Sequence, residues 1–303
     1  MKNAELEKII VIGGPTCVGK SDKAVDIALE YGGEVVSADS VQIYRGLDIG
    51  SGKITKDEMR GVPHHMIDII DPYETFTVMD FAERAKKVIT DIISRGKLPV
   101  VVGGTGFYIN ALIHGYDCGK AKPDPMLRRQ LKLMEERNGK GFLYMLLKKL
   151  DPETSLSAND MPRIERKLER LLAPDRDMNE QPAGRDMYDA LFVVMDADRE
   201  KLDEKAARRI SAMMDAGLME EVERLLPYRN FPCMGSVGYK QCLTGLNSHM
   251  PRCDIEESMR VAYHGLIKKQ QTFFRWIRWD NKIYARNWEM AEADRAIKEF
   301  INK

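Results

Sequence analysis

The sequence predicts an α/β fold, in which helices flank a parallel β-sheet and the chain carries an inserted all-helical domain. Three observations lead to this expectation. Short apolar runs alternate with helical patterns over residues 1–115, which is the order expected for a doubly wound parallel sheet. The stretch 116–185 has helical patterns and no convincing strand. An apolar run at 188–195 then predicts a strand that returns to the sheet.

Length and composition place the chain among ordinary soluble globular proteins. It has 303 residues, of which 44% are hydrophobic and 31% charged, so disordered, collagen-like and membrane classes are excluded. No apolar run approaches the roughly 18 residues that span a bilayer, and the N-terminus lacks the pattern of a signal peptide. A cytoplasmic location is therefore expected. Lys plus Arg equals Asp plus Glu at 47 each, so a basic face for nucleic acid must come from local clustering.

The cysteines predict reduced thiols. They are five, an odd number, and none forms a CxxC pair. A disulfide framework and a cysteine metal site are both disfavoured by this pattern. The cysteines are Cys17, Cys118, Cys233, Cys242 and Cys253.

The first part of the chain reads as alternating strands and helices. Residues 9–12 form an apolar run before a glycine-rich loop, and a helix begins at Lys20 and ends at Gly32. Strands are predicted at 34–37 and 65–70. A helix is predicted over 78–95, and the unbroken apolar run 98–102 predicts a buried parallel strand that ends in Gly-Gly.

The domain boundaries follow from a change of character near residue 116. A polar, proline-bearing connection begins there, and helical patterns continue to about residue 185. We expect residues 1–115 and 186–303 to form the catalytic core, and residues 116–185 to form the inserted helical domain. After the strand at 188–195 the rest of the chain is predicted to be helical.

The glycine-rich loop carries the strongest motif in the sequence. Gly14, Gly19, Lys20 and Ser21 match the spacing G-x-x-x-x-G-K-[ST], between a predicted strand and a predicted helix. Backbone N–H groups and the helix N-terminus of such a loop bind phosphate, Lys20 adds positive charge, and the Ser21 hydroxyl is a candidate Mg2+ ligand. The sheet is thus expected to be P-loop NTPase-like, the fold of many nucleotide- and ATP-binding proteins. The predicted phosphate-binding residues are Gly14, Pro15, Thr16, Cys17, Val18, Gly19, Lys20 and Ser21.

Further blocks of sequence narrow the function. They are VSADSVQIYRGLDIGSGK (36–53), GVPHHMIDIIDP (61–72), VVVGGTGFYINALIHG (100–115), SVGYKQ (236–241) and KKQQTFFR (268–275). With the phosphate loop, these blocks resemble the tRNA dimethylallyltransferases, also called tRNA isopentenylpyrophosphate transferases, of the bacterial type. The matching blocks lie in order from residue 14 to residue 275, which is nearly the whole chain.

The resemblance implies a prenyl transferase that holds dimethylallyl diphosphate with the phosphate loop and does not hydrolyse ATP. It implies transfer of the dimethylallyl group to N6 of adenosine 37, in tRNAs that read codons beginning with U, with release of diphosphate. Mg2+ is the implied cofactor and the anticodon stem-loop of tRNA the implied partner. We expect a monomer that does not associate with membranes.

Three residues are candidates for catalysis. Asp39, after the second strand, is a candidate general base for the proton of the adenine amine. Lys20 stabilises the leaving diphosphate. Thr105 lies, like Thr16, on a glycine-rich loop at the carboxyl end of a neighbouring strand, where open α/β sheets bind ligands. An alternative for Asp39 is a helix-capping or Mg2+-supporting role, as in P-loop kinases.

The resemblance also implies a set of tRNA contacts. One group lies near the target base, which must leave the stack for chemistry, and a second group lies in the helical insertion, where Arg163, Arg166, Lys167 and Arg170 give a basic stripe. A solvated helix face is the alternative reading of this stripe. For His64 and His65 we expect structural roles. The predicted tRNA-binding residues are Asp39, Ser40, Val41, Gln42, Thr105, Arg128, Pro162, Arg163, Ile164, Glu165 and Arg166.

The sequence departs from the family pattern in a few places. Gly52 and Lys167 stand where members usually have alanine. Lys205 aligns with the arginine that members place early in the helix after the return strand to hold diphosphate, and lysine supplies charge without the bidentate fork. The zinc finger of eukaryotic members is absent from the sequence, since no C-x2-C precedes an H-x3-5-H.

Three alternative functions stay open at this point. A small-molecule kinase has the same loop and an Asp after the second strand, but it consumes ATP without tRNA. An adenylate isopentenyltransferase uses AMP or ADP as acceptor and does not need the helical insertion or the basic C-terminal block. A noncatalytic P-loop RNA-binding protein leaves the placement of Asp39 and Thr105 unexplained.

Overall fold

A computed structural model describes residues 6–115, 124–173, 186–277 and 279–303 of the chain. The chain divides into two compact units. The first unit comprises Met1–Gly115 and Arg185–Lys303, and the second comprises Tyr116–Gly184.

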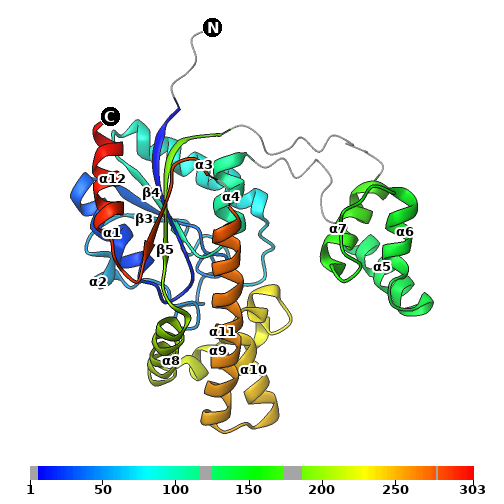
Figure 1. Ribbon diagram of the computed structural model, residues 1–303. Coiled ribbons are helices and arrows are strands. Elements are labelled where there is room, and N and C mark those ends of the chain that lie inside the picture. The colour runs from blue at the N-terminus through cyan, green and yellow to red at the C-terminus, as the bar shows by residue number, and fades with distance from the viewer. Residues whose placement is uncertain (1–5, 116–123, 174–185, 278) are drawn as a thin grey trace. The chain divides into compact units, whose positions relative to one another are not determined.

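The first unit is built on a six-stranded sheet with the order β3-β2-β4-β1-β5-β6. Every neighbouring pair of strands is parallel, and Figure 1 shows the sheet between two groups of helices. Parallel strands need crossover connections, which the helices between them supply. The strands are β1 (Lys8–Gly13), β2 (Glu34–Ser37), β3 (His64–His65), β4 (Pro99–Gly103), β5 (Asp189–Asp196) and β6 (Lys282–Arg286).

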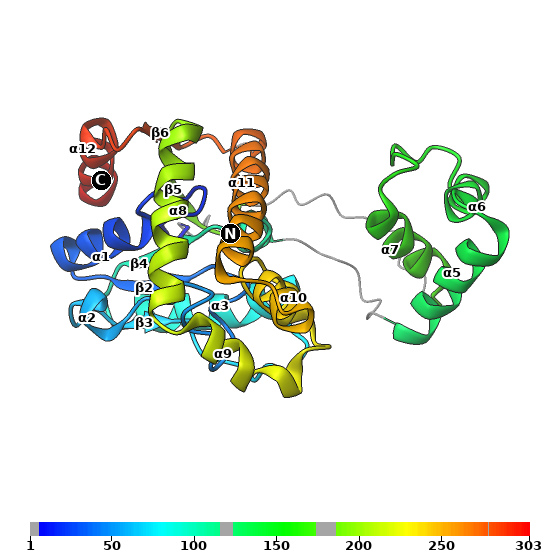
Figure 2. The same cartoon turned by 90° about the horizontal axis from the view of Figure 1, so that it is seen from below.

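Alternate side chains of the inner strand β1 pack into two separate hydrophobic cores on opposite faces of the sheet. Ile10 and Ile12 pack in the core that contains the buried faces of α1, α8 and α12. Ile9 and Val11 pack in the opposite core with α3 and α4. Figure 2 shows α1 and α12 on one side of the sheet and α3 on the other. A parallel sheet covered on both faces has apolar strands without alternation, which is why β1 and β4 appear as unbroken apolar runs.

The helices of the first unit surround this sheet. Over residues 124–173 the second unit has three helices, which enclose a small core of Leu131, Leu143, Leu147, Ile164 and Leu168. None of the helices in the described ranges is long and apolar enough to cross a membrane. In the first unit the helices are α1 (Lys20–Tyr31), α2 (Lys56–Met59), α3 (Val78–Ser94), α4 (Gly106–His114), α8 (Arg199–Asp215), α9 (Leu218–Arg224), α10 (Tyr239–Ser248), α11 (Arg252–Trp276) and α12 (Ala291–Asn302), with 3-10 turns η1 (Leu226–Tyr228) and η2 (Pro232–Gly235); in the second they are α5 (Pro125–Asn138), α6 (Phe142–Leu150) and α7 (Met161–Leu172).

The predicted P-loop NTPase-like sheet and its return strand at 188–195 are confirmed, and two details of the sheet are wrong. The strand expected at 65–70 is only the two-residue β3, because the chain turns at Met66 and Asp68 with φ of 64° and 54°. Strand β6 was not expected at all. It is short and partly exposed, and among the described strands it pairs only with β5, so its sequence lacks the apolar run that marks the inner strands.

Glu34 anchors the start of β2 to the end of α3. Its carboxylate accepts hydrogen bonds from Arg95 Nη2 at 2.9 Å and pairs with His65 Nε2 at 2.7 Å. The hydrogen bonds from Arg95 lower the pKa of Glu34 to about 2, against the effect of burial. His64 Nδ1 lies 2.8 Å from the carbonyl oxygen of Val62, so both histidines make structural contacts, as expected.

We expect Glu34→Gln to lower the free energy of unfolding at pH 7 by about 1–3 kcal/mol, because a buried charged partner of Arg95 is lost. A carboxylate with a lowered pKa stabilises the fold above its unfolded pKa, and this contribution disappears as pH falls toward 2. The deficit of the variant, measured by urea unfolding, should therefore shrink between pH 5 and pH 2. Asp91→Asn, which alters an exposed partner of Arg95, is the control and should cost little. An equal deficit at all pH values would contradict this account.

Candidate functional site

The phosphate loop joins the end of β1 to the start of α1. Gly14 has a φ of 148°, and a Cβ built on it would lie 2.1 Å from the carbonyl oxygen of Met195, so a larger residue would push the loop away from β5. Gly19 caps α1 in a left-handed conformation with φ of 90°. The loop therefore has the backbone that leaves N–H groups at the helix N-terminus available to an anion.

Lys20 is the first residue of α1 and lies against its own loop. Its Nζ donates a hydrogen bond to the carbonyl oxygen of Pro15 at 2.6 Å. Desolvation lowers the pKa of Lys20 to about 8; the nearby Asp39 opposes this shift and Arg209 adds to it. The amine thus lies in a weakly hydrated place where a phosphate would be a stronger partner than a neutral carbonyl.

Asp39 and Thr105 follow the carboxyl ends of β2 and β4, and Thr105 bonds to Ser40, the residue after Asp39. The Asp39 Oδ1 accepts hydrogen bonds from the N–H groups of Val41 at 2.8 Å and Gln42 at 3.2 Å. The Thr105 Oγ1 accepts from the Ser40 N–H at 3.0 Å and donates to the Ser40 Oγ at 3.2 Å. One carboxylate oxygen of Asp39 therefore caps the following turn, and the capping alternative describes that oxygen. Within the described ranges, the other oxygen makes no hydrogen bond.

Two cavities adjoin at Asp39. The first, about 840 Å³, is lined by residues of the phosphate loop, which include Lys20 and Ser21, and by Gln42 and Lys205. The second, about 430 Å³, is lined by Ser40, Val41, Thr105 and several aromatic side chains, with Phe107 and Phe273 at a ring-centroid distance of 4.9 Å. The residues that line both cavities are Thr16, Asp39, Ser51, Gly104 and Arg209.

A buried carboxylate that the sequence did not reveal shapes the wall between these cavities. Glu221 of α9 is 1% exposed, and it accepts hydrogen bonds from the backbone N–H groups of Asp48, Ile49 and Gly50 at 3.1, 2.8 and 3.1 Å. It also accepts from the Tyr239 hydroxyl at 2.6 Å. These four donors satisfy the carboxylate, and they fix the loop that leads to Ser51.

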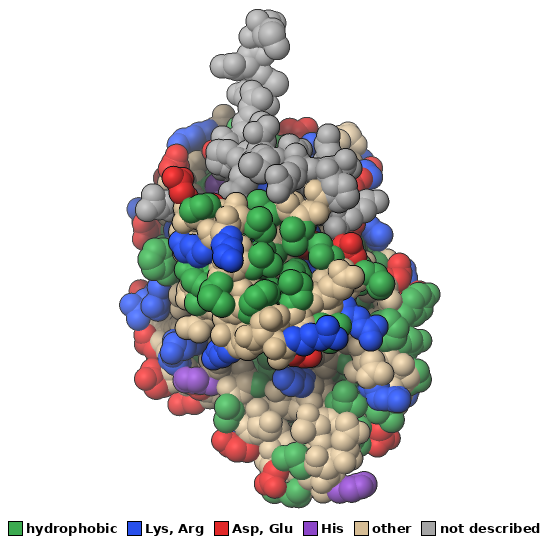
Figure 3. All heavy atoms as spheres, turned by 90° about the vertical axis from the view of Figure 1, so that its right-hand side faces the viewer, with side chains coloured by type: hydrophobic (Ala, Val, Ile, Leu, Met, Phe, Trp, Pro, Cys, Tyr) green, Lys and Arg blue, Asp and Glu red, His purple; other side chains and the backbone are tan. Residues whose placement is uncertain are grey.

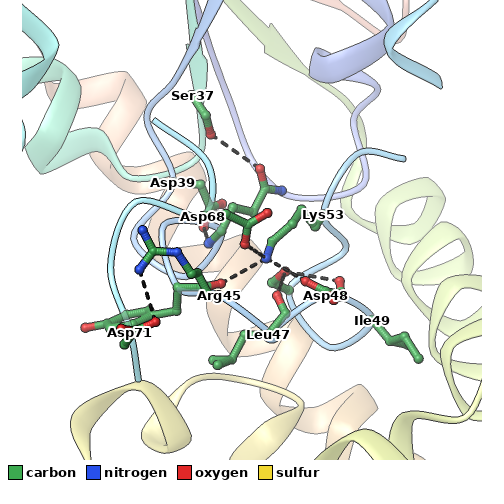
Figure 4. Close-up of polar contacts among 12 residues, drawn as sticks. Ser37, Asp39, Arg45, Leu47, Asp48, Ile49, Lys53, Asp68 and Asp71 are labelled. Atoms are coloured by element: carbon green, nitrogen blue, oxygen red, sulfur yellow. Dashed lines mark hydrogen bonds and ion pairs between the residues drawn. The ribbon is translucent and has the colours of Figure 1, made fainter. Parts of the chain in front are cut away.

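Lys53 holds the next part of the same loop. Its Nζ bonds to Asp48 at 2.6 Å, to Asp68 at 2.5 Å and to the carbonyl oxygen of Tyr44 at 2.9 Å. Figure 4 shows this lysine between the two carboxylates, with Ser37 and Asp39 nearby at the end of β2. The side chain of Lys53 is 8% exposed, so its charge is used within the protein to order the loop.

Arg209 and Lys205 of α8 add positive charge to the first cavity. Arg209 Nη2 lies 3.4 Å from the Gly52 carbonyl oxygen, and a Cβ at Gly52 would be 1.4 Å from that nitrogen. The absence of a side chain at Gly52 therefore gives the Arg209 guanidinium its place. Arg209 was not predicted as a site residue, because the sequence drew attention to Lys205 one turn earlier.

Gln270 of α11 joins the two glycine-rich loops. Its Oε1 accepts a hydrogen bond from the Thr16 N–H at 2.8 Å, and its Nε2 donates to the carbonyl oxygen of Gly104 at 3.0 Å. The neighbouring Gln271 donates to Asp196 at 2.7 Å, at the end of β5. The block KKQQTFFR thus supports the site from the C-terminal part of the chain, a role that its sequence alone did not indicate.

The residues predicted in the helical insertion lie in the second unit. Glu169 is 2% exposed, and it pairs with Arg128 at 2.9 Å and Arg166 at 2.5 Å. Arg163 is more open, with 65% of its side chain exposed and a pair with Asp160 at 3.1 Å. Ile164 is fully buried, so a contact of its side chain with a partner is excluded in the folded unit. The basic stripe is therefore partly neutralised by internal ion pairs.

Hydrophobic side chains are exposed to solvent, as are lysine and arginine side chains, and Figure 3 shows both kinds on the surface. Large apolar side chains exposed on the second unit include Met126, Leu133, Met145 and Leu172. Pro162 and Glu165 lie in the same helix as Arg163, α7.

Of the cysteines, Cys17, Cys233, Cys242 and Cys253 are free thiols, and Cys118 lies outside the described residues.

Comparisons with known proteins identify relatives of the chain. The family model described as IPP transferase matches residues 42–276. A tRNA dimethylallyltransferase of Exiguobacterium sp. is 40% identical over 271 residues, which is 88% of this chain and 87% of that relative. One of Bacillus subtilis is 34% identical over 280 residues, with 90% and 89% covered.

Solved structures of similar enzymes match the fold of this chain. The full-length tRNA isopentenylpyrophosphate transferase of Bacillus halodurans has a TM-score of 0.71 at 34% identity, with 98% of this chain and 95% of that chain covered. A eukaryotic dimethylallyltransferase acting on tRNA has a TM-score of 0.80 at 27% identity, with 98% and 80% covered.

Proposed function

The chain belongs to the IPP transferase family and is an enzyme of the tRNA dimethylallyltransferase class, and we propose that it transfers the dimethylallyl group from dimethylallyl diphosphate to N6 of adenosine 37. The acceptors are tRNAs that read codons beginning with U. The observation that carries this proposal is the shared wall of the two cavities, where Asp39 faces a phosphate-loop cavity on one side and an aromatic-lined cavity on the other.

The first cavity fits the diphosphate. Lys20, Lys205 and Arg209 supply positive charge around the loop, and loop N–H groups add donors that need no reorganisation when charge develops. Mg2+ fits here too, because the Ser21 hydroxyl and the Asp39 carboxylate both line this cavity and oxygen ligands are those that Mg2+ takes beside phosphate. When bound, Mg2+ would neutralise charge on the diphosphate oxygens, with Ser21 as its protein ligand.

The second cavity fits the acceptor base. Phe107 and Phe273 offer ring faces for stacking, as single-stranded and flipped bases require. The N6 lone pair attacks C1 of the dimethylallyl group, and the C1–O bond breaks with its electron pair leaving on diphosphate. The proton lost from N6 passes to Asp39, whose position at the shared wall suits this role.

The test is incubation with labelled dimethylallyl diphosphate, Mg2+ and unmodified tRNA, followed by nucleoside analysis. Label in N6-dimethylallyl adenosine, recovered from the tRNA fragment that contains position 37, supports the proposal. Parallel reactions with AMP as acceptor, and with ATP in place of the prenyl donor, test the adenylate isopentenyltransferase and the kinase. Label in AMP alone, or ATP consumption without tRNA, would overturn it. We also propose that the protein is cytoplasmic and monomeric. Analytical sedimentation measures the oligomeric state.

For the second unit we expect different outcomes from two arginine substitutions. Arg163→Ala removes an exposed charge, so tRNA should bind more weakly, while dimethylallyl diphosphate binds as before. The slope of the logarithm of the tRNA binding constant against the logarithm of the salt concentration should become shallower by about one unit. Arg166→Ala removes a partner of the buried Glu169, so it should also destabilise the second unit. Filter binding across a salt series and thermal unfolding separate the two effects. An unchanged salt slope for Arg163→Ala would identify the stripe as a solvated face.

A further inference from the structure

The segment that follows β6 has an unusual backbone. Asn287 and Trp288 are consecutive non-glycine residues with φ of 51° and 65°. The left-handed region is uncommon for non-glycine residues and is an outlier for a bulky one such as tryptophan. Such a conformation persists only where its surroundings fix it, and it is often found beside functional sites.

The surroundings of Asn287 do fix it. Its N–H donates to the Asp196 carbonyl oxygen at 2.8 Å, and its side-chain oxygen accepts from the Asp198 N–H at 3.0 Å. Its amide nitrogen donates to the Asp198 carboxylate at 2.9 Å. Asp198 is the residue before α8, so the turn is tied both to the end of β5 and to the start of the helix that carries Lys205.

This turn directs the Trp288 indole toward the phosphate loop. The Nε1 of Trp288 donates a hydrogen bond to the carbonyl oxygen of Val18 at 2.8 Å. A Cβ built on Gly19 would lie 3.8 Å from the same nitrogen, so the edge of the indole lies beside the N-terminus of α1. The loop thereby gains a partner from a residue 270 positions later in the chain.

The same indole carries Lys205 on its ring. The Nζ of Lys205 lies 3.8 Å from the Trp288 ring centroid, well within the range of a cation–π interaction. Lys205 lines the first cavity, whereas Trp288 is not among the lining residues. An ammonium group has three N–H donors, and contact with one ring face leaves donors for a ligand in the cavity.

We propose that Trp288 is a positioning residue of the diphosphate site, which holds the Lys205 ammonium at the cavity wall and the phosphate loop at Val18. A free lysine side chain loses rotamer entropy when it binds an anion. A lysine already held on an indole ring has less to lose, so its charge is better used. The inference deepens the proposed function and rests on it, because it assigns the C-terminal turn to the site that binds diphosphate.

The experiment uses inorganic pyrophosphate with Mg2+ as the probe and the full chain as the protein. Dissociation constants are measured by calorimetry for the wild type, Trp288→Leu, Lys205→Met and the double variant. We expect Trp288→Leu to raise the dissociation constant about 3- to 30-fold, the range of a cation–π contact. The double variant should lose less affinity than the two single losses combined predict, because both changes remove the contact between Lys205 and the ring. Any loss beyond that of Lys205→Met reports the contact of Trp288 with Val18.

Tryptophan emission gives a second reading. Pyrophosphate should change the emission of the wild type and of Trp276→Phe, which alters a side chain that is 79% exposed, but not that of Trp288→Phe. The phenylalanine variant keeps a ring for Lys205 but lacks the N–H donor to Val18. Its pyrophosphate affinity is therefore the measurement to use if Trp288→Leu unfolds at a lower temperature.

Three results would overturn the inference. Wild-type affinity in both Trp288 variants removes the positioning role, and so do losses that simply add in the double variant. A wild-type protein that does not bind pyrophosphate at all removes the diphosphate site itself, and the inference with it.

Discussion

Lys20→Ala is expected to lower kcat/KM for prenyl transfer about 30- to 1000-fold. Losing a charged contact to a developing phosphate oxyanion in a poorly hydrated site costs about 2–4 kcal/mol in the transition state. Within the described residues, this amine donates a hydrogen bond to a neutral carbonyl oxygen, that of Pro15 at 2.6 Å. Diphosphate therefore replaces a weak partner by a strong one. Steady-state kinetics with tRNA and dimethylallyl diphosphate measure the loss.

Lys23→Ala is the matched control for this variant. Lys23 lies on the next turn of α1 and pairs with Asp294 at 2.5 Å, away from the phosphate loop. Its removal should leave turnover within about twofold, as expected for a pair close to the surface. Equal activity of Lys20→Ala and Lys23→Ala would exclude the phosphate loop from the mechanism.

The pH dependence of anion binding adds a second reading for Lys20. Its pKa is lowered to about 8, and the protonated amine is the form that attracts diphosphate. Pyrophosphate affinity should therefore fall as pH rises through about 8, and binding above this pH should take up a proton. Lys20→Ala should lose the part of this dependence that Lys20 causes. Calorimetry in buffers of different ionisation enthalpy measures the proton uptake.

The sequence predicted those parts of the site that depend on neighbouring residues. The phosphate loop is such a case, since its glycines, Lys20 and the start of α1 lie within eight positions. The strand before each loop was predictable too, because inner parallel strands are apolar on both faces. Thr16 and Thr105 were predicted at the carboxyl ends of neighbouring strands, and Asp39 at the end of the second strand; all three line the second cavity.

The parts that the sequence did not predict depend on distant partners. Glu221 holds a loop 171 positions away from it, and Trp288 bonds to Val18 across 270 positions. Neither residue lies in a spacing pattern that names its partner. Strand β6 was not predicted because this edge strand is partly exposed and its sequence has no apolar run. The inserted helices were predicted, but not that Arg128 and Arg166 share the buried Glu169, because ion pairs depend on how helices pack.

Asp39→Asn is the second substitution with a large expected effect. Turnover should fall about 10²- to 10⁴-fold, the contribution of a positioned general base. The oxygen that caps Val41 and Gln42 at 2.8 and 3.2 Å is retained in asparagine, so the turn and the cavities should keep their shape. Substrate binding should therefore change little, and single-turnover kinetics with saturating tRNA measure the chemical step directly.

The asparagine variant also separates the general base from a role in supporting Mg2+. If Asp39 accepts the proton from N6, raised Mg2+ should not restore the activity of the variant, because asparagine cannot accept a proton. If Asp39 only supports the metal, raised Mg2+ should restore much of the activity, since the weakened site would then be filled. Asp48→Asn is the control: it changes a carboxylate of the same cavity that pairs with Lys53 at 2.6 Å and should keep a single-turnover rate near that of the wild type. Recovery of Asp39→Asn at high Mg2+, or a single-turnover rate near that of the wild type, would assign the proton transfer to another group.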